Sequence, residues 1–234
     1  RWPVGTGGVF VALRVISIAL VLPLRWVVPA TSAFMLQDES GRVPVLHEWV
    51  SLDGLGVAPV LAVVAAEDQK FADHFGFDVE SIRDSIEESQ AGGRLRGAST
   101  ISQQVAKNLY LWNGRSFLRK GVEAYMTVLL ELCLPKARII EIYLNVAELG
   151  PGIYGFGAAS AYYFGRPPSR LSDHEAALLA AVLPNPHRLN AGRPSGYVRE
   201  RQRWTVGQMP RPSRQGGRMR LRGPGEPHRR AGSE

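Results

Sequence analysis

Glu67 and His74 belong to a polar segment, EDQKFADHFG over residues 67–76, that directly follows the apolar run VLAVVAA. At helical spacing Glu67, Phe71 and His74 fall on one face, so we expect a carboxylate and an imidazole to flank an aromatic ring. Desolvation at the end of an apolar helix raises the pKa of a carboxyl group, which suits a general base. His74 has no second His or Cys at ligand spacing, which favours a hydrogen-bonded structural role over metal binding.

A second polar segment, GASTISQQVAKN over residues 97–108, has the pattern of a helix start. Ser99 or Thr100 can cap the helix, and Gln103, three residues after Thr100, can close a capping box. The first turns then present as neighbours Gln103, Gln104 and Lys107. Both segments place polar groups where a buried core would have apolar ones, so we interpret the two segments as one candidate site.

Three further segments follow these two: RKGVE at 119–123, KARIIEIYLN at 136–145, and a long Gly- and Ala-rich stretch at 150–186 that ends in LPNP. In this order and spacing, the five segments resemble the signature motifs of the family 51 glycosyltransferases, the peptidoglycan polymerases that use lipid II. The resemblance covers about residues 33–205. No second enzymatic domain follows, so the chain is most similar to the monofunctional branch of the family rather than to the bifunctional penicillin-binding proteins.

The resemblance implies a role for each matching residue. Glu67 would be the base that deprotonates the 4-hydroxyl of the acceptor lipid II, and Glu123 the second essential carboxylate. Lys107 and Arg115 would contact the pyrophosphate of the donor strand. Attack on C1 of the donor would invert the α-linked pyrophosphate to a β-1,4 linkage in one displacement. When the residues are considered without the resemblance, the alternative is that Lys107 and Arg115 are solvated cations on the protein surface.

Other motif positions are expected to bind or position substrate: Asp68, Gly97, Ser99, Gln103, Gln104, Arg119 and Lys120. The family also implies a divalent cation, usually magnesium, held with the pyrophosphate by one or two carboxylates such as Asp68 or Glu123. Glu123 has an alternative interpretation as the i, i+4 ion-pair partner of Arg119. Within KARIIEIYLN, the resemblance assigns mostly fold support to Lys136, Glu141, Tyr143 and Asn145, and the apolar face formed by Ile139, Ile140 and Leu144 has the period of a core helix.

The composition, 234 residues with 45% apolar content, is typical of one domain with appendages. The formal net charge is +7, but residues 206–234 hold seven arginines against two glutamates and so supply five of these charges. Nucleic-acid binding therefore loses its main support. The single Cys133 lies in an apolar run, is expected in the core and excludes an intramolecular disulfide.

Residues 1–32 are expected to form a membrane anchor with a transmembrane helix at about 9–28, since this run is long enough to span a bilayer. Arg14 and Arg25 lie near its ends, where they can snorkel, and they disfavour a buried core helix. A cleaved signal is disfavoured because no convincing cleavage site follows. The glycosyltransferase domain is expected over 33–205, and a disordered basic tail over 206–234.

The fold class predicted is all-α, because helical patterns dominate and strand signals are nearly absent. Helices are expected at 59–73, 78–90, 100–111, 118–132, 137–144, 155–163 and 172–182, with an irregular or short extended approach at 44–55. The resemblance implies a lysozyme-like arrangement with a cleft. It also implies lipid II, the growing lipid-linked glycan and the membrane as partners, with the catalytic domain on the periplasmic face of the inner membrane.

Two rival functions stay open. A lytic transglycosylase or lysozyme-type hydrolase of the same fold would cut glycan rather than build it, but such an enzyme has no use for a pyrophosphate clamp. A catalytically inactive membrane scaffold of cell-wall assembly is the other rival, although every polar motif position is filled. Partners among cell-wall synthesis or division proteins, polymer length and oligomeric state are not encoded in any motif.

Overall fold

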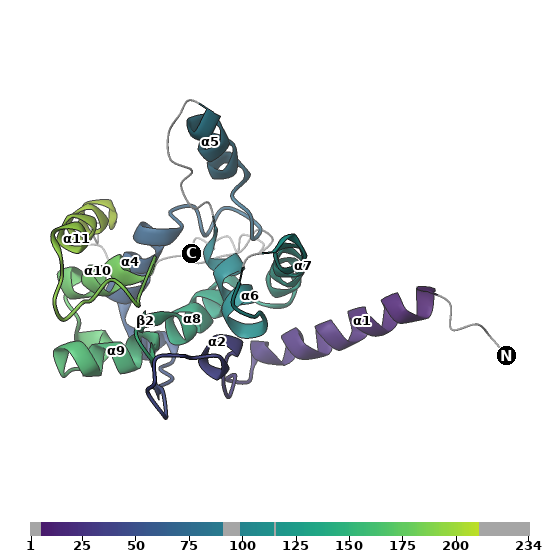
Figure 1. The fold of residues 1–234 in the computed structure, drawn as a ribbon, viewed down its shortest axis with the longest axis horizontal. Helices are drawn as coiled ribbons and strands as arrows, with labels where there is room; N and C mark the ends of the chain where they lie inside the picture. The colour runs from purple at the N-terminus through teal and green to yellow at the C-terminus, as the bar shows by residue number, and fades with distance from the viewer. Residues whose placement is uncertain (1–5, 91–98, 115, 211–234) are drawn as a thin grey trace, which may run out of the picture.

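The computed structural model describes residues 6–90, 99–114 and 116–210. A mostly helical body carries the long N-terminal helix α1, which projects away from it to the right in Figure 1, and the helix α5, which rises from its top in the same view. The helical character predicted from the sequence is confirmed. Gly97, Arg115 and residues 211–234, which hold most of the expected tail, lie outside the described residues.

The N-terminal apolar run does not form the single helix that we expected over 9–28. Helix α1 covers Thr6–Val21, and the chain then tightens into the 3-10 turn η1, Leu22–Arg25. Pro23 explains the change, because proline lacks the N–H that an α-helix requires in its interior. Among the described residues, no helix combines the length and the apolar character needed to cross a membrane.

Arg138 ties the segment after α1 to the body. Its guanidinium donates to the carbonyls of Leu24 at 2.7 Å and Val27 at 2.9 Å. The same group pairs with Glu141 at 2.9 Å and lies over the ring of Trp49. These contacts are possible because Arg138 lies in the first turn of a helix that itself packs in the centre of the domain.

The remaining helices agree with most of the expected ones to within one or two residues. Their bounds are α2 Ala33–Leu36, α3 Leu52–Leu55, α4 Val57–Glu67, α5 Val79–Gln90, α6 Ile101–Tyr110, α7 Phe117–Cys133, α8 Lys136–Val146, α9 Gly155–Phe164, η2 Pro168–Arg170, α10 Asp173–Val182 and α11 Gly196–Gln208. Helix α11 was not predicted, and it continues past residue 205. It packs on α10 and α4.

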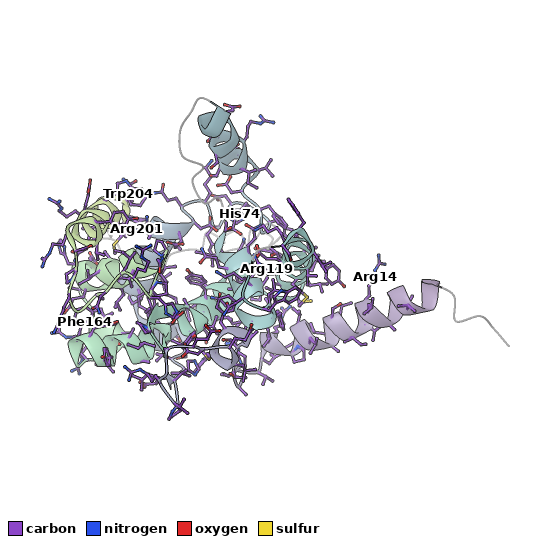
Figure 2. All side chains as sticks on the ribbon, in the orientation of Figure 1. Arg14, His74, Arg119, Phe164, Arg201 and Trp204 are labelled. Carbon is purple, nitrogen blue, oxygen red and sulfur yellow. The ribbon has the colours of Figure 1, made fainter. Side chains whose placement is uncertain are left out.

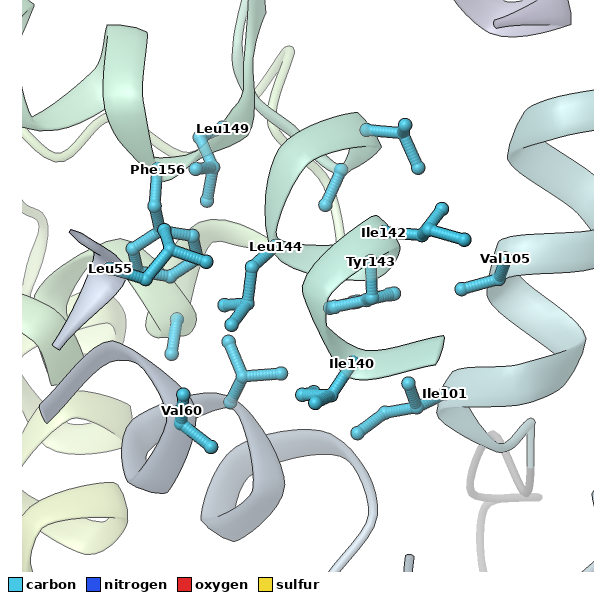
Figure 3. Close-up of a cluster of buried hydrophobic side chains, with 14 of the residues drawn as sticks. Leu55, Val60, Ile101, Val105, Ile140, Ile142, Tyr143, Leu144, Leu149 and Phe156 are labelled. Atoms are coloured by element: carbon cyan, nitrogen blue, oxygen red, sulfur yellow. The ribbon is translucent and has the colours of Figure 1, made fainter. Parts of the chain in front are cut away.

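Helix α8 runs through the core, as its apolar period predicted. Ile139, Ile140, Tyr143 and Leu144 are all fully buried. Figure 3 shows the side chains of α8 between those of α6 on one side and those of α4 and α9 on the other. Burial of this face contributes to the apolar core. It packs α8 against α4, which ends at Glu67, and against α6, which carries Gln104 and Lys107.

A small sheet departs from the all-α prediction. It pairs β1 (Leu46–His47) parallel to β3 (Ile153–Tyr154), and β3 antiparallel to β2 (Glu148–Gly150). Strands of two or three residues are too short to show an alternating pattern, so the sequence carries no signal for them. Asn145 fastens this region to α8, because its side chain accepts from Val50 N and donates to Val50 O, each at 2.8 Å.

Helix α4 ends at Glu67, and the expectation that Glu67, Phe71 and His74 share one helical face is therefore wrong. Asp68 leaves the helical region with φ −160° and ψ 78°. Its carboxylate accepts from the backbone N–H of Ile101 at 3.0 Å and contacts His74 Nε2 at 2.9 Å. These tertiary hydrogen bonds stabilise the non-helical conformation of Asp68, although the local sequence pattern favours a helix that continues past it.

Candidate active site

Glu67 is the last residue of α4, and the apolar body of that helix holds its carboxylate in a sheltered position. Its side chain is 12% exposed. The amide of Gln104 donates to Glu67 Oε2 at 3.0 Å, and the guanidinium of Arg201 donates to Oε1 at 2.9 Å. Burial raises the pKa of Glu67, and the contacts with Gln104 and Arg201 oppose that rise only in part. The raised pKa suits a group that must accept a proton near neutral pH.

Tyr143 fixes the orientation of the Gln104 amide. The buried Tyr143 hydroxyl donates to Gln104 Oε1 at 3.0 Å, which leaves the NH₂ group of Gln104 directed at Glu67. A carboxamide with its oxygen and nitrogen both committed cannot flip without losing both hydrogen bonds. Residues of the core helix α8 and of α6 thus jointly position the carboxylate of α4.

Glu67 forms part of the wall of a cavity of about 880 Å³. This cavity, called here the Glu67 cavity, is lined by Ala66, Glu67, Ser99, Gln104, Lys107, Leu183, Pro184, Tyr197, Glu200, Arg201 and Trp204. Figure 2 labels Arg201 and Trp204, which both come from α11. A cavity of this size accepts a disaccharide-sized ligand beside the buried carboxylate.

Lys107 also reaches the Glu67 cavity from α6. It makes no ion pair with any carboxylate of the described residues, and its ammonium lies 5.3 Å from the centre of the Phe34 ring. Burial lowers the pKa of Lys107, while the charges of Glu123 and Glu67 act in the opposite direction. A sheltered ammonium without a carboxylate partner is available to an anionic ligand.

Ser99 and Gln103, both predicted to contact substrate, differ in their surroundings. The cap of α6 is Thr100, and Gln103 closes the capping box by accepting from Thr100 N at 3.0 Å, as predicted. Gln103 is 5% exposed, so its side chain serves the helix start. Ser99 is exposed and lines the Glu67 cavity, which leaves its predicted substrate contact open.

Glu123 lies in α7, buried between two cations of its own helix. It pairs with Arg119 at 3.1 Å and with Lys120 at 2.5 Å. The i, i+4 ion pair expected from the sequence is confirmed, and the catalytic role implied by the resemblance stays a prediction. The negative charge of Glu123 opposes the lowering of the Lys107 pKa by burial.

The two carboxylates expected to hold magnesium do not fit that role in this arrangement. Both oxygens of Asp68 contact His74, and one also accepts from Ile101 N. Both oxygens of Glu123 are paired with cations. Within the described part of the chain, no group of three or more His, Cys, Asp or Glu side chains lies close enough to hold a metal ion.

Arg201 is the main site residue that sequence reasoning missed. It lies in the unpredicted helix α11, within the segment RERQRW, where alternating cations resemble a solvated surface. Its guanidinium also donates to the carbonyl of Ala66 at 3.2 Å. No local pattern distinguishes Arg201 from its neighbours, so only the packing of α11 on α4 reveals its role.

One large cavity of this helical domain holds a buried carboxylate with a raised pKa and, among the described residues, an ammonium without a carboxylate partner. These groups suit a group-transfer enzyme that needs a base and a site for an anion. The chain matches the family described as transglycosylase over residues 37–210. It belongs to that family.

Curated relatives extend the match over most of the chain. The chain is 52% identical over 203 residues to a biosynthetic peptidoglycan transglycosylase of Stutzerimonas stutzeri, a match that covers 84% of each sequence. It is 49% identical over 197 residues to the protein of that name in Shewanella oneidensis, covering 82% of this chain and 84% of the relative. A third, from Citrobacter koseri, is 56% identical over 175 residues, covering 74% and 72%.

Proposed function

We propose that this enzyme polymerises lipid II into β-1,4-linked glycan strands, with Glu67 as the base that activates the acceptor hydroxyl. The supporting observation is the meeting of Glu67 and Lys107 on one cavity of about 880 Å³. The reaction needs a base for the attacking 4-hydroxyl and a cation for the departing pyrophosphate, and these two residues supply both kinds of group.

The base acts in one displacement. Glu67 takes the proton from the 4-hydroxyl of lipid II as that oxygen attacks C1 of the growing strand. The bond from C1 to the lipid pyrophosphate breaks, and the pyrophosphate leaves with the electron pair. Gln104 and Arg201 hold the carboxylate in place, and burial raises its pKa toward the range in which proton acceptance is efficient.

Lys107 faces the charge that develops on the leaving group. Its ammonium is sheltered, so a negative charge beside it is stabilised more strongly than in water. Arg115, eight residues later in the sequence, is proposed as its partner, because a guanidinium fork matches phosphate oxygens in a bidentate manner.

We also propose that the enzyme acts at the periplasmic face of the inner membrane, which carries its lipid-linked substrate. Helix α1 supports this because large apolar side chains cover its exposed surface, among them Val11 at 62%, Leu13 at 58% and Ile16 at 56% exposure. An exposed apolar surface of this kind favours contact with lipid. Leu13→Glu with Ile16→Glu should release the protein from lipid vesicles in a sedimentation assay. Unchanged sedimentation would remove α1 as the contact.

The direct test is chain extension from labelled lipid II by the purified protein, compared with Glu67→Gln. The wild type should form long glycan, and the variant should form none while still binding lipid II with similar affinity. Near-wild-type polymerisation by the folded variant would remove Glu67 as the base. Cleavage of isolated peptidoglycan without extension would favour the lytic alternative, and the absence of both activities would favour the scaffold.

A further inference from the structure

The aromatic ring of Phe34 lies against the ammonium of Lys107. The distance from Lys107 Nζ to the centre of the ring is 5.3 Å, which is inside the range of about 6 Å over which a cation is attracted to an aromatic face. Phe34 belongs to the short helix α2, which follows the N-terminal segment in the chain. The proposed reaction uses Lys107 but gives no part to this ring.

Hydrogen bonds hold Phe34 in a fixed place beside α6. The Tyr154 hydroxyl donates to the carbonyl of Phe34 at 3.2 Å. The side chain of Gln37, directly after α2, donates to the carbonyl of Leu111 and accepts from the backbone N–H of Asn113, each at 3.1 Å. Both of these backbone groups lie just beyond the end of α6. The hydrogen bonds therefore fasten α2 to the helix that carries the ammonium.

The ring contacts the ammonium from outside the Glu67 cavity. Lys107 lines two cavities, the Glu67 cavity and a smaller one of about 300 Å³. Phe34 lines the smaller cavity together with Lys107, but it is not part of the wall of the Glu67 cavity. The ring can thus stabilise the ammonium without occupying the space in which a substrate would lie beside Glu67.

An aromatic ring is a suitable partner for an ammonium that must bind an anion. Burial lowers the pKa of Lys107 and so disfavours its charged form. The negative face of the ring favours the charged form. Unlike a carboxylate, the ring has no net charge that would compete with an anionic ligand, and it leaves the N–H donors of the ammonium free for phosphate oxygens.

We propose that Phe34 is a positioning residue of the reaction, whose ring stabilises the charged ammonium of Lys107 and holds it toward the pyrophosphate of the donor strand. The inference rests on the proposed polymerisation of lipid II and on the role of Lys107 in it. Phe34 acts through Lys107 and not on the substrate. Its effect on the rate should therefore exist only while the side chain at position 107 carries a charge.

The test is a double-mutant cycle on the single-turnover rate of chain extension from labelled lipid II. Phe34→Leu removes the ring but keeps an apolar side chain, and Lys107→Met removes the charge but keeps a long stem. In the wild-type background, Phe34→Leu should lower the rate about three- to tenfold, the range of a cation–π contact. In the Lys107→Met background, the same substitution should change the rate by less than about twofold.

Three further variants control for packing. Phe34→Tyr keeps an aromatic face against the ammonium and should keep the rate close to that of the wild type. Phe164→Leu is the matched control, because Phe164 is also a half-buried phenylalanine of a helix but lines neither of the two cavities. Its rate should equal that of the wild type. Phe34→Met is a second variant without a ring, so the comparison does not depend on the folding of Phe34→Leu.

The outcomes separate this inference from the proposed function. A wild-type rate in Phe34→Leu overturns the inference, and so does an equal loss in Phe34→Leu and Phe34→Tyr. An equal fold loss in both backgrounds also overturns it, because the effect is then independent of the charge of Lys107. All three results leave polymerisation intact. A wild-type rate in Lys107→Met removes Lys107 from the mechanism and the inference with it, whereas failure of the wild type to extend lipid II overturns the proposed function itself.

Discussion

The guanidinium of Arg201 donates to the carboxylate of Glu67 at 2.9 Å, although 134 residues separate the two in the chain. The contact joins α11 to the end of α4 and places a cation on the residue with the raised pKa. An adjacent positive charge favours the ionised form of a carboxyl group, whereas burial disfavours it. The activity of the base thus depends on a balance between the two.

Arg201→Ala should shift that balance. Without the guanidinium, the pKa of Glu67 rises further, and the acid limb of the kcat/KM profile for chain extension should move upward by about one pH unit or more. Arg201→Lys should move it less, since the charge remains. The exposed Arg203→Ala on the same helix is the matched control. If the acid limb of the kcat/KM profile of Arg201→Ala lies at the same pH as that of the wild type, the ion pair does not control the pKa of Glu67.

The raised pKa of Glu67 also predicts a pH-dependent effect on stability. The folded protein takes up this proton at higher pH than the unfolded chain does, so between the two pKa values the contribution of Glu67 to stability falls as pH rises. Glu67→Gln removes the titration. The Tm of the variant relative to wild type should therefore rise from about pH 5 to about pH 7.5. If calorimetry shows that the Tm difference between Glu67→Gln and the wild type does not change with pH, the raised pKa of Glu67 is contradicted.

Lys107 should act mainly in the transition state. Lys107→Ala should lower the single-turnover rate of chain extension by about 30- to 1,000-fold, or about 2–4 kcal/mol, with a smaller effect on lipid II affinity. Arg115→Ala should behave alike, and Arg115→Lys should recover only part of the rate because the fork is missing. If the substitutions lower only the affinity for lipid II and leave the rate unchanged, these residues bind the ground state and the transition state equally and do not stabilise the leaving group.

Lys136 and Glu131 form a buried ion pair that should matter for stability. Their side chains are 2% and 3% exposed and lie 2.8 Å apart, and Lys136 also stacks over the Phe71 ring at 4.5 Å. Lys136→Met should destabilise the fold by about 3–5 kcal/mol in urea unfolding, because it leaves the Glu131 charge buried. Lys70→Met, which breaks the exposed pair with Glu80, should have little effect on the midpoint. Equal effects of the two substitutions would contradict the role of burial.

Helices with a continuous apolar face and a capping signal could be predicted from the sequence. The capping box of Thr100 and Gln103 and the buried face of α8 were both found as expected. Helix α11 was missed because its polar residues dominate and only Val198 and Thr205 are buried. The short sheet was missed because its strands offer no period, and α4 was extended too far because Asp68 bonds across the fold.

The sequence by itself determined the helical class, the ordered motifs and the candidate residues Glu67, Gln104 and Lys107. These signals are local, since caps, helical periods and motif spacings involve residues only a few positions apart. The tertiary structure alone decided that Arg201 neutralises part of the charge on Glu67 and that Asp68 is committed to the fold. Such pairings depend on which helices pack together and on how much water burial removes, and neither quantity is encoded in any short stretch of the chain.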